Sequence, residues 1–299
     1  MTTAYRTHDV AVRGGHLRVA EWAPEQPPVA TVLAVHGITA SHLAWTWLAD
    51  ALPQVRILAP DLRGRGRSNA LPGPFGLAAH AADLVDVLEA FDLPSAVVVG
   101  HSMGGFVAAT LAHQRPDLVA GLLLVDGGLP LPLPDGVGQD EAGEAAARLL
   151  GPAAERLTRS FPDHSAYREF WAAHPAFVGE WSERLERYID YDLDGDRPAT
   201  LPQAMLTDAA QLYGGPDYRA VLQALPEGTV FLSAPRGLLD EEPGLYPEST
   251  VAQWSSRFRG LSVRGVGGVN HYTIVMSDQG VAAVCESLGD LLRLPVGHR

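Results

Sequence analysis

Short apolar runs alternate with amphipathic stretches through the first 128 residues. The apolar runs, rich in Val, Leu and Ala, lie at residues 31–35, 56–60, 96–100 and 121–125. Continuous runs of this kind are typical of strands buried on both faces. Residues 77–91 and 106–114, between the runs, carry apolar side chains at helical spacing. This alternation predicts an α/β fold with a doubly wound, mostly parallel sheet.

Two shorter segments precede this alternation. Residues 9–12 and 16–22 flank the turn Arg13-Gly14-Gly15 and predict an N-terminal hairpin. After residue 215 the strand pattern returns at 228–233 and 261–266, with predicted helices at 250–258 and 280–294.

The alternation stops at Leu129, where leucine and proline alternate through Pro134. Such a run forms neither a helix nor a central strand, so we expect a hinge there. Helical patterns then follow at 141–150, 152–161, 165–173 and 179–191, and nine of the 22 Phe, Trp and Tyr residues lie in this part of the chain. We therefore predict a core domain of residues 1–128 and 216–299, interrupted by an all-helical cap insertion of residues 129–215.

One serine lies between a predicted strand and a predicted helix, in Gly100-His101-Ser102-Met103-Gly104. A Gly-x-Ser-x-Gly sequence in this context is the signature of a nucleophile elbow. The sharp turn exposes the Ser102 hydroxyl, and the following helix directs the positive end of its dipole at it. The Met103 N–H is then free to bind a developing oxyanion.

These motifs resemble the α/β-hydrolase superfamily, in particular its serine-nucleophile members with a helical cap. The sequence Asp61 to Ser68 also resembles the Asp-x-x-Gly-x-Gly-x-Ser connection of that family. The resemblance implies a second oxyanion donor, the Ile38 N–H, in the turn after His36-Gly37. It also implies that His271, just past the last predicted strand, is the general base.

The acid of the implied triad has more than one candidate. Asp240 follows the penultimate predicted strand in a Gly-x-x-Asp arrangement that resembles the family pattern, and it is our expected acid. Asp126, at the end of the 121–125 strand, is the alternative, and Glu241 and Glu242 are further candidates. The order nucleophile, acid, histidine holds for each of them.

Composition limits the other classes of function. The formal net charge is −13 without a basic stripe, so we expect no nucleic-acid partner. We expect no membrane partner and a cytoplasmic location, because no signal core or spanning apolar run is present. The chain has one cysteine and no Cys/His cluster with zinc spacing, so no metal or other cofactor is implied. The expected partner is a small-molecule substrate, and the chain is a monomer or homodimer.

We predict a serine hydrolase that cleaves an ester, lactone or related carbonyl bond of a fairly apolar small molecule. The expected substrate contacts are His42, Trp45, Phe170, Trp171 and Trp181. Serine at the elbow separates the chain from haloalkane dehalogenases and epoxide hydrolases, which carry aspartate there in the resembled family. Two alternatives stay open: a cofactor-free C–C hydrolase, lyase or oxygenase with His271 as base, and a non-catalytic ligand-binding protein on the same scaffold.

Overall fold

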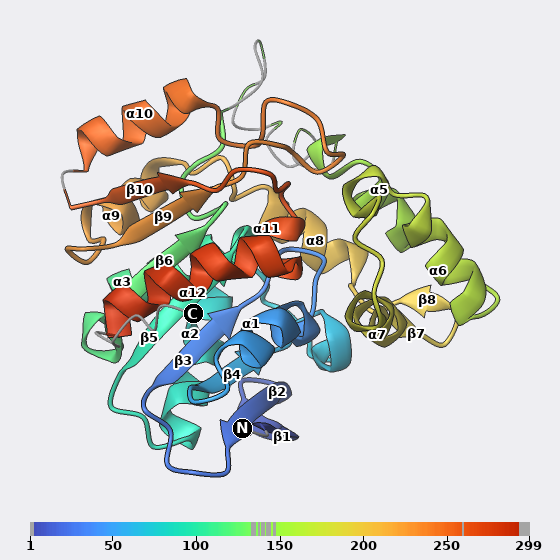
Figure 1. Ribbon diagram of the computed structural model, residues 1–299, viewed down its shortest axis with the longest axis horizontal. Coiled ribbons are helices and arrows are strands. Elements are labelled where there is room, and N and C mark those ends of the chain that lie inside the picture. Colours follow the sequence, from blue (N-terminus) through green and yellow to red (C-terminus); the bar gives the residue numbers. More distant parts are fainter. Residues whose placement is uncertain are drawn as a thin grey trace.

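An eight-stranded sheet forms the centre of the computed structural model (Figure 1). The model describes residues 3–292 except 133–135, 137, 139, 140, 142–144, 146, 147 and 259. In sheet order the strands are β1 (Thr3–Val12), β2 (Gly15–Pro24), β4 (Arg56–Pro60), β3 (Thr31–Val35), β5 (Ala96–His101), β6 (Val119–Val125), β9 (Val230–Ser233) and β10 (Ser262–Gly265). From β4 to β10 all neighbours are parallel, and β2 pairs antiparallel with both β1 and β4.

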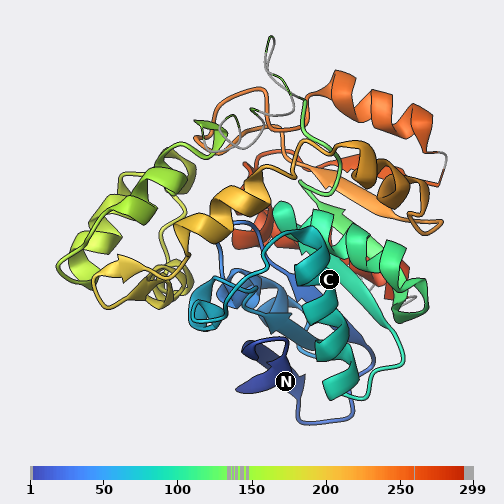
Figure 2. The same ribbon diagram turned by 180° about the vertical axis from the view of Figure 1, so that it is seen from behind.

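Helices cover both faces of this sheet, as a doubly wound fold requires. The helices on one face are α1 (Thr46–Ala51), α11 (Thr273–Met276) and α12 (Asp278–Leu292), and those on the other face are α2 (Leu77–Ala90), α3 (Met103–Gln114) and α9 (Pro216–Gln223) (Figures 1 and 2). Helix α10 (Glu248–Arg257) packs beside the edge strand β10. Side chains of β3, β5 and β6 are almost fully buried because helices enclose them on both faces.

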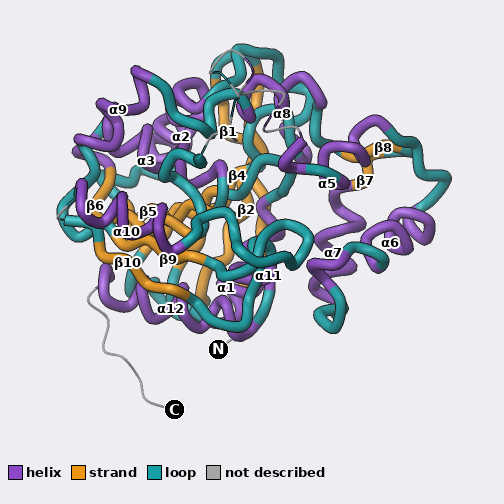
Figure 3. The backbone as a smooth tube through the Cα atoms, turned by 90° about the horizontal axis from the view of Figure 1, so that it is seen from above, coloured by secondary structure: helices purple, strands orange, loops and turns teal. Residues whose placement is uncertain are grey.

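The insertion, residues 129–215, leaves the sheet after β6 and returns before α9. Its described elements include α5 (Pro152–Glu155), α6 (His164–Ala172), α7 (Glu183–Asp192), α8 (Pro202–Ala209) and the two-residue strands β7 (Leu193–Asp194) and β8 (Arg197–Pro198). Helices α6 and α7 lie on one side of the sheet, away from α9 and α10 (Figure 3). The insertion is therefore not all helical, since β7 and β8 pair as a small antiparallel sheet.

The sequence pattern predicted the strands of the core well, and the fold class is confirmed. The N-terminal hairpin is longer than predicted because its strands extend to Thr3 and Pro24. The predicted helix at 152–161 ends early, in a 3₁₀ turn at Arg156–Thr158. Half of the predicted helix at 141–150, residues 142–144, 146 and 147, lies outside the described residues. Among the helices that are described, none is both long and apolar enough to cross a membrane.

Candidate active site

Ser102 occupies the tight turn between β5 and α3. Its backbone has φ 55° and ψ −126°, a left-handed conformation that L-residues rarely adopt. The strain persists because β5 and α3 are both buried and hold the turn from either side. Met103 is the first residue of α3, so its N–H has no intrahelical carbonyl to bind. The turn thus presents a hydroxyl and a backbone donor side by side.

Two glycines let neighbouring backbone approach this turn closely. A Cβ at Gly104 would lie 2.1 Å from the Val35 carbonyl oxygen, at the end of β3. A Cβ at Gly127 would lie 2.0 Å from the carbonyl oxygen of Ser102. Both distances are far below any van der Waals contact, so these positions require glycine. The small residues therefore bring the ends of β3 and β6 against the serine.

His271 lies between Ser102 and a buried carboxylate. Its Nε2 is 3.0 Å from Ser102 Oγ, and its Nδ1 is 2.7 Å from Asp126 Oδ2. An ionised carboxylate only accepts hydrogen bonds, so Nδ1 carries the proton and Nε2 is free to accept one from the serine. The side chains of His271 and Asp126 are 4% and 0% exposed, which excludes water from this pair. The geometry is that of a nucleophile, a base and an orienting acid.

The expectation that Asp240 orients the histidine is wrong in this geometry. The other oxygen of Asp126 accepts a hydrogen bond from the Ala234 N–H at 3.0 Å, and the Asp126 N–H donates to Leu232 O at 2.7 Å. These two hydrogen bonds hold Asp126 between the ends of β6 and β9. The acid position beside His271 is therefore occupied by Asp126 and not by Asp240. Asp240 is instead 37% exposed at its side chain and pairs with Arg236 Nε at 2.8 Å.

Asp240 nevertheless contacts the loop that carries the base. Its Oδ1 accepts a hydrogen bond from Asn270 Nδ2 at 2.9 Å. The same amide nitrogen donates to the Ala176 carbonyl of the insertion at 2.9 Å. Asn270 Oδ1 accepts from the N–H groups of Tyr272 and Thr273, so the turn around His271 is fixed from both sides.

The two glutamates considered as acids, Glu241 and Glu242, are exposed. Glu241 accepts a hydrogen bond from the Leu239 N–H at 2.7 Å and closes a local turn. Neither has a described contact with His271.

His101, the neighbour of the serine, holds the backbone of the base. Its Nε2 donates to the His271 carbonyl oxygen at 2.8 Å, and the two rings lie 4.8 Å apart between centroids. Burial, together with the nearby His271, lowers the pKa of His101 well below its ordinary value. His101 is thus a neutral packing residue beside the site.

The His36-Gly37-Ile38 turn is fixed by buried side chains. His36 Nε2 accepts from the Leu62 N–H at 2.9 Å, so its Nδ1 carries the proton and donates to the Gly37 carbonyl at 2.8 Å. This pattern requires a neutral ring, and burial lowers the pKa of His36 to about 4. Arg65 Nε donates to the Ile38 carbonyl at 2.9 Å. Ile38 and Met103 both line the cavity beside Ser102. Their backbone N–H groups are the two oxyanion donors that we expect from the sequence.

This cavity has a volume of about 20 Å³ and a mostly aliphatic lining. Besides Ser102, His271 and Asp126, its walls are made by Phe106, Tyr246, Gly127 and the leucines Leu131, Leu149, Leu150, Leu212, Leu238 and Leu245, together with Ile38 and Met103. Leucines from the hinge, the insertion and the β9–α10 connection therefore converge on the serine. The Leu-Pro repeat that begins at Leu129 contributes only Leu131 to this lining.

The five residues expected to touch substrate lie elsewhere. His42 is buried against Asp61, with Nδ1 2.8 Å from Oδ1, and Trp45 is fully buried in the core. Trp171 packs inside the insertion and Phe170 packs on Tyr167. Trp181 is 37% exposed and donates to Glu186. None of them lines the cavity, so the expectation of an aromatic pocket is corrected to an aliphatic one.

Buried polar contacts fasten the insertion to the loops beside the site. Arg156 donates to the Thr39 carbonyl at 2.8 Å, pairs with Asp192 at 3.0 Å and stacks over the Trp171 ring. Although burial opposes its charge, Asp192 raises the pKa of Arg156 above its ordinary value. Asp192 in turn accepts from the Tyr167 hydroxyl.

A second set of buried polar contacts joins α8 to the arginine-rich loop, residues 61–68. Asp208 pairs with Arg65 at 2.5 Å and His80 at 2.9 Å, and it accepts from the Gly76 N–H at 2.6 Å. Burial opposes the charge of Asp208, but Arg65 and His80 together hold the pKa of this carboxyl below its ordinary value. Arg65 therefore links the insertion directly to the Ile38 turn. The loop at 61–68 thus joins α8 of the insertion to the Ile38 turn of the core.

The described residues contain no group of three or more His, Cys, Asp or Glu side chains that could hold a metal ion. The chemistry that the site offers rests on its serine, its histidine, its carboxylate and its backbone donors.

Comparison with known proteins places this geometry in a family. The model of a family described as "alpha/beta hydrolase fold" matches residues 30–187. Lipase LipV of Mycobacterium tuberculosis is 44% identical over 110 residues, which cover 37% of this chain and 41% of the lipase. Epoxide hydrolase B of the same species is 28% identical over 250 residues, which cover 79% of this chain and 65% of that enzyme. The chain thus spans less than two thirds of the length of these two curated relatives.

Solved structures share the fold across nearly the whole chain. E-2-(acetamidomethylene)succinate hydrolase superposes with a TM-score of 0.73 at 20% identity and covers 96% of this chain and 99% of its own. A peroxisomal alpha-beta-hydrolase from Saccharomyces cerevisiae superposes with a TM-score of 0.75 at 16% identity, covering 99% and 91%. At these identities the likeness concerns the fold alone.

Proposed function

Since the chain belongs to the α/β-hydrolase fold family, we propose that it is a serine hydrolase with Ser102 as nucleophile, His271 as base and Asp126 as acid. The observation that carries the proposal is the continuous hydrogen-bonded line from Asp126 Oδ2 through His271 to Ser102 Oγ. A serine hydroxyl is a weak nucleophile until such a base lies within hydrogen-bond distance.

In the first half of the reaction His271 Nε2 takes the Ser102 proton while Oγ attacks a substrate carbonyl carbon. The carbonyl oxygen gains negative charge, which the N–H groups of Ile38 and Met103 would bind. Asp126 stabilises the imidazolium that forms, without taking its proton. His271 then protonates the leaving alcohol, and an acyl-enzyme on Ser102 results.

In the second half water enters beside His271, which removes one of its protons. The hydroxide attacks the acyl carbon, the Ser102 oxygen leaves, and His271 returns the proton to it. The products are a carboxylic acid and a regenerated serine. The proton transfers of both halves use the hydrogen-bonded contacts between Ser102, His271 and Asp126.

The aliphatic lining supports an apolar acyl group. The leucines around Ser102 offer no charged partner to a substrate, so the lining favours an apolar acyl group over a charged one. A lipase is among the relatives, in line with an ester substrate. An epoxide hydrolase is also among them, but the elbow here carries serine in place of a carboxylate nucleophile.

Rapid-mixing kinetics with p-nitrophenyl butyrate test the proposal. We expect a burst of p-nitrophenol equal to the enzyme concentration, followed by slower turnover, because the acyl-enzyme accumulates. Ser102→Ala should abolish the burst. A wild type that converts a β-diketone but shows neither burst nor turnover with esters, lactones and thioesters would favour the proton-transfer alternative instead.

A further inference from the structure

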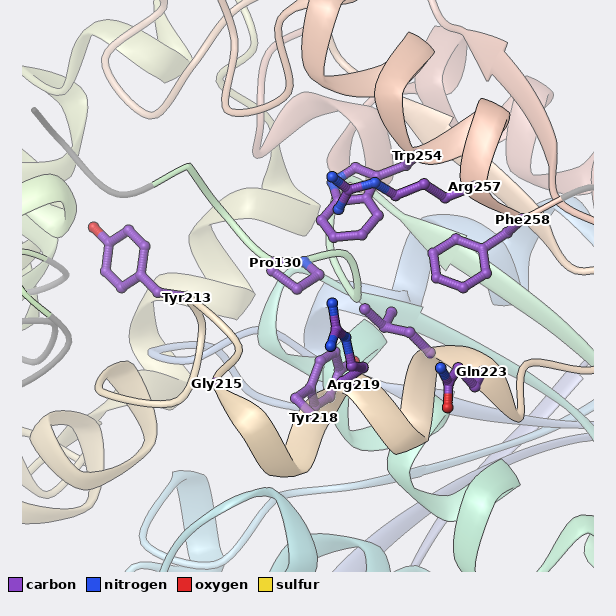
Figure 4. A pocket seen from close by; sticks show the side chains of 10 residues that line it. Pro130, Tyr213, Gly215, Tyr218, Arg219, Gln223, Trp254, Arg257 and Phe258 are labelled. Carbon is purple, nitrogen blue, oxygen red and sulfur yellow. The ribbon is translucent and has the colours of Figure 1, made fainter.

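A hollow of about 560 Å³ lies between α9 and α10 and shares no lining residue with the cavity beside Ser102. Figure 4 shows residues of α9 on one wall and residues at the end of α10 on the other. Its aromatic walls are Tyr218, Trp254 and Phe258, and Pro130 of the hinge closes one side. This volume is typical of small-molecule sites.

Two arginines extend into the hollow from opposite walls, Arg219 from α9 and Arg257 from α10 (Figure 4). Neither has an ion pair with a described residue, and no acidic residue is among the described residues that line the hollow. In a chain of formal net charge −13, two cations that lack an ion pair with a described residue form a local positive site. The lining is therefore suited to an anion.

Trp254 adds a rigid aromatic surface. Arg257 Cζ lies 5.2 Å from the centroid of the Trp254 ring, which orients the guanidinium over the indole. The same ring stacks on Phe258 at 5.9 Å with an interplanar angle of 19°. Its Nε1 is fully buried, so the ring contributes its aromatic surface to the hollow.

A second hollow of about 370 Å³ adjoins the first one and shares Leu222, Gln223, Arg257 and Phe258 with it. Its further lining includes Leu225 and Leu261, and also the acidic residue Glu227. The guanidinium groups thus lie beside aromatic and aliphatic walls on which an apolar ligand body can pack. A bare inorganic anion would leave these walls exposed to water.

We propose that this hollow binds a small amphiphilic carboxylate, with its carboxyl group between Arg219 and Arg257 and its apolar body on Trp254 and Phe258. Guanidinium groups match carboxylates in geometry and form charge-assisted hydrogen bonds. The site goes beyond the proposed hydrolysis, since it shares no described lining residue with the serine cavity.

Calorimetric titration of the full-length Ser102→Ala protein with 4-phenylbutyrate tests this site. We compare two matched probes, 4-phenylbutyramide, which keeps the body without the charge, and acetate, which keeps the charge without the body. We expect both to bind at least about tenfold more weakly than 4-phenylbutyrate. Equal affinity of the amide and the carboxylate overturns the proposal, as does no binding of 4-phenylbutyrate at all.

Variants locate the binding. Arg219→Gln and Arg257→Gln should each weaken 4-phenylbutyrate binding by about tenfold. Both side chains are exposed, so the fold is retained, which circular dichroism checks. Arg197→Gln removes an exposed arginine of the insertion that is outside the hollow, and it should leave the affinity unchanged. If all three variants bind alike, the carboxylate lies elsewhere and the proposal fails.

Discussion

The strand ends around Ser102 and the neighbouring insertion place buried polar groups differently. At the strand ends, Asp126, His271 and Ser102 form one line that ends in an accessible hydroxyl. In the insertion, Arg156 donates a hydrogen bond to a carbonyl of a core loop. Asp208 pairs with a core arginine and accepts a hydrogen bond from a core N–H group. The first arrangement ends in a serine hydroxyl that, among the described residues, is bound only to His271, whereas the second joins the insertion to the core. The comparison indicates that the candidate catalytic groups lie in the core, whereas the buried polar groups of the insertion attach it to the core.

The largest expected effect is the difference in kcat between substitutions at two carboxylates, Asp126 and Asp240. Asp126→Asn should lower kcat for an ester by about 10³- to 10⁴-fold, because an amide cannot hold His271 in the required tautomer. Asp240→Asn should lower kcat by less than about tenfold, since Asp240 acts only through Asn270. Steady-state kinetics of both variants check this. The reverse ranking would restore Asp240 as the acid.

The next effect tests the attachment of the insertion. Asp208→Ala should lower the free energy of unfolding by about 3–5 kcal/mol, because Arg65 would remain buried without its partner. Asp9→Ala, which breaks the exposed pair with Arg18, is the control and should cost about 0–1 kcal/mol. Urea unfolding measures both. Similar losses in the two variants would show that α8 is not held by this cluster.

The third effect concerns pH and the turn before Ile38. The pKa of His36 is about 4 in the folded chain and about 6.5 when unfolded, so the unfolded chain binds more protons between these values. The contribution of His36 is present above pH 6.5 and is lost as the pH falls toward 4, at up to about 1.4 kcal/mol per pH unit.

Replacing His36 by Asn should remove that share of the slope, whatever it does to stability at pH 7. Urea unfolding of the wild type and of His36→Asn at several pH values between 4 and 6.5 measures the two slopes. Equal slopes would mean that His36 does not titrate with unfolding in this range.

The smallest effect contrasts one leucine with one tryptophan. Leu212→Ala enlarges the cavity beside Ser102 and should shift kcat/KM toward longer acyl chains by about tenfold. Trp181→Ala should leave the chain-length profile within about twofold, because the indole is exposed and contacts Glu186. A series of p-nitrophenyl esters measures both profiles. A changed profile in the Trp181 variant would bring the insertion aromatics back to the substrate.

The core strand ends around Ser102 were easier to predict from the sequence than the insertion. Turns such as Gly100 to Gly104 carry their geometry in local residue choice, so Ser102 and its setting were predictable. His271 was placed by its position after the last strand. The choice between Asp126 and Asp240 depends on contacts with β9 and with Asn270, which no local pattern shows.

The insertion residues were harder to predict for a related reason. An aromatic side chain such as Trp171 packs equally well against a substrate or against its own helices, and here it packs against Arg156 and Phe177. The leucines that line the cavity are common residues with no distinctive spacing. Only the tertiary structure decides which of them face the serine.

The most direct test of the account is intact mass after exposure to a fluorophosphonate, for the wild type and for Ser102→Ala, His271→Ala and Asp126→Asn. We predict one adduct on the wild type, none on the serine variant, and labelling slowed at least about a hundredfold in the other two. Fast labelling of Asp126→Asn, or an adduct on the folded Ser102→Ala protein, would contradict the claim that Asp126 and His271 activate Ser102.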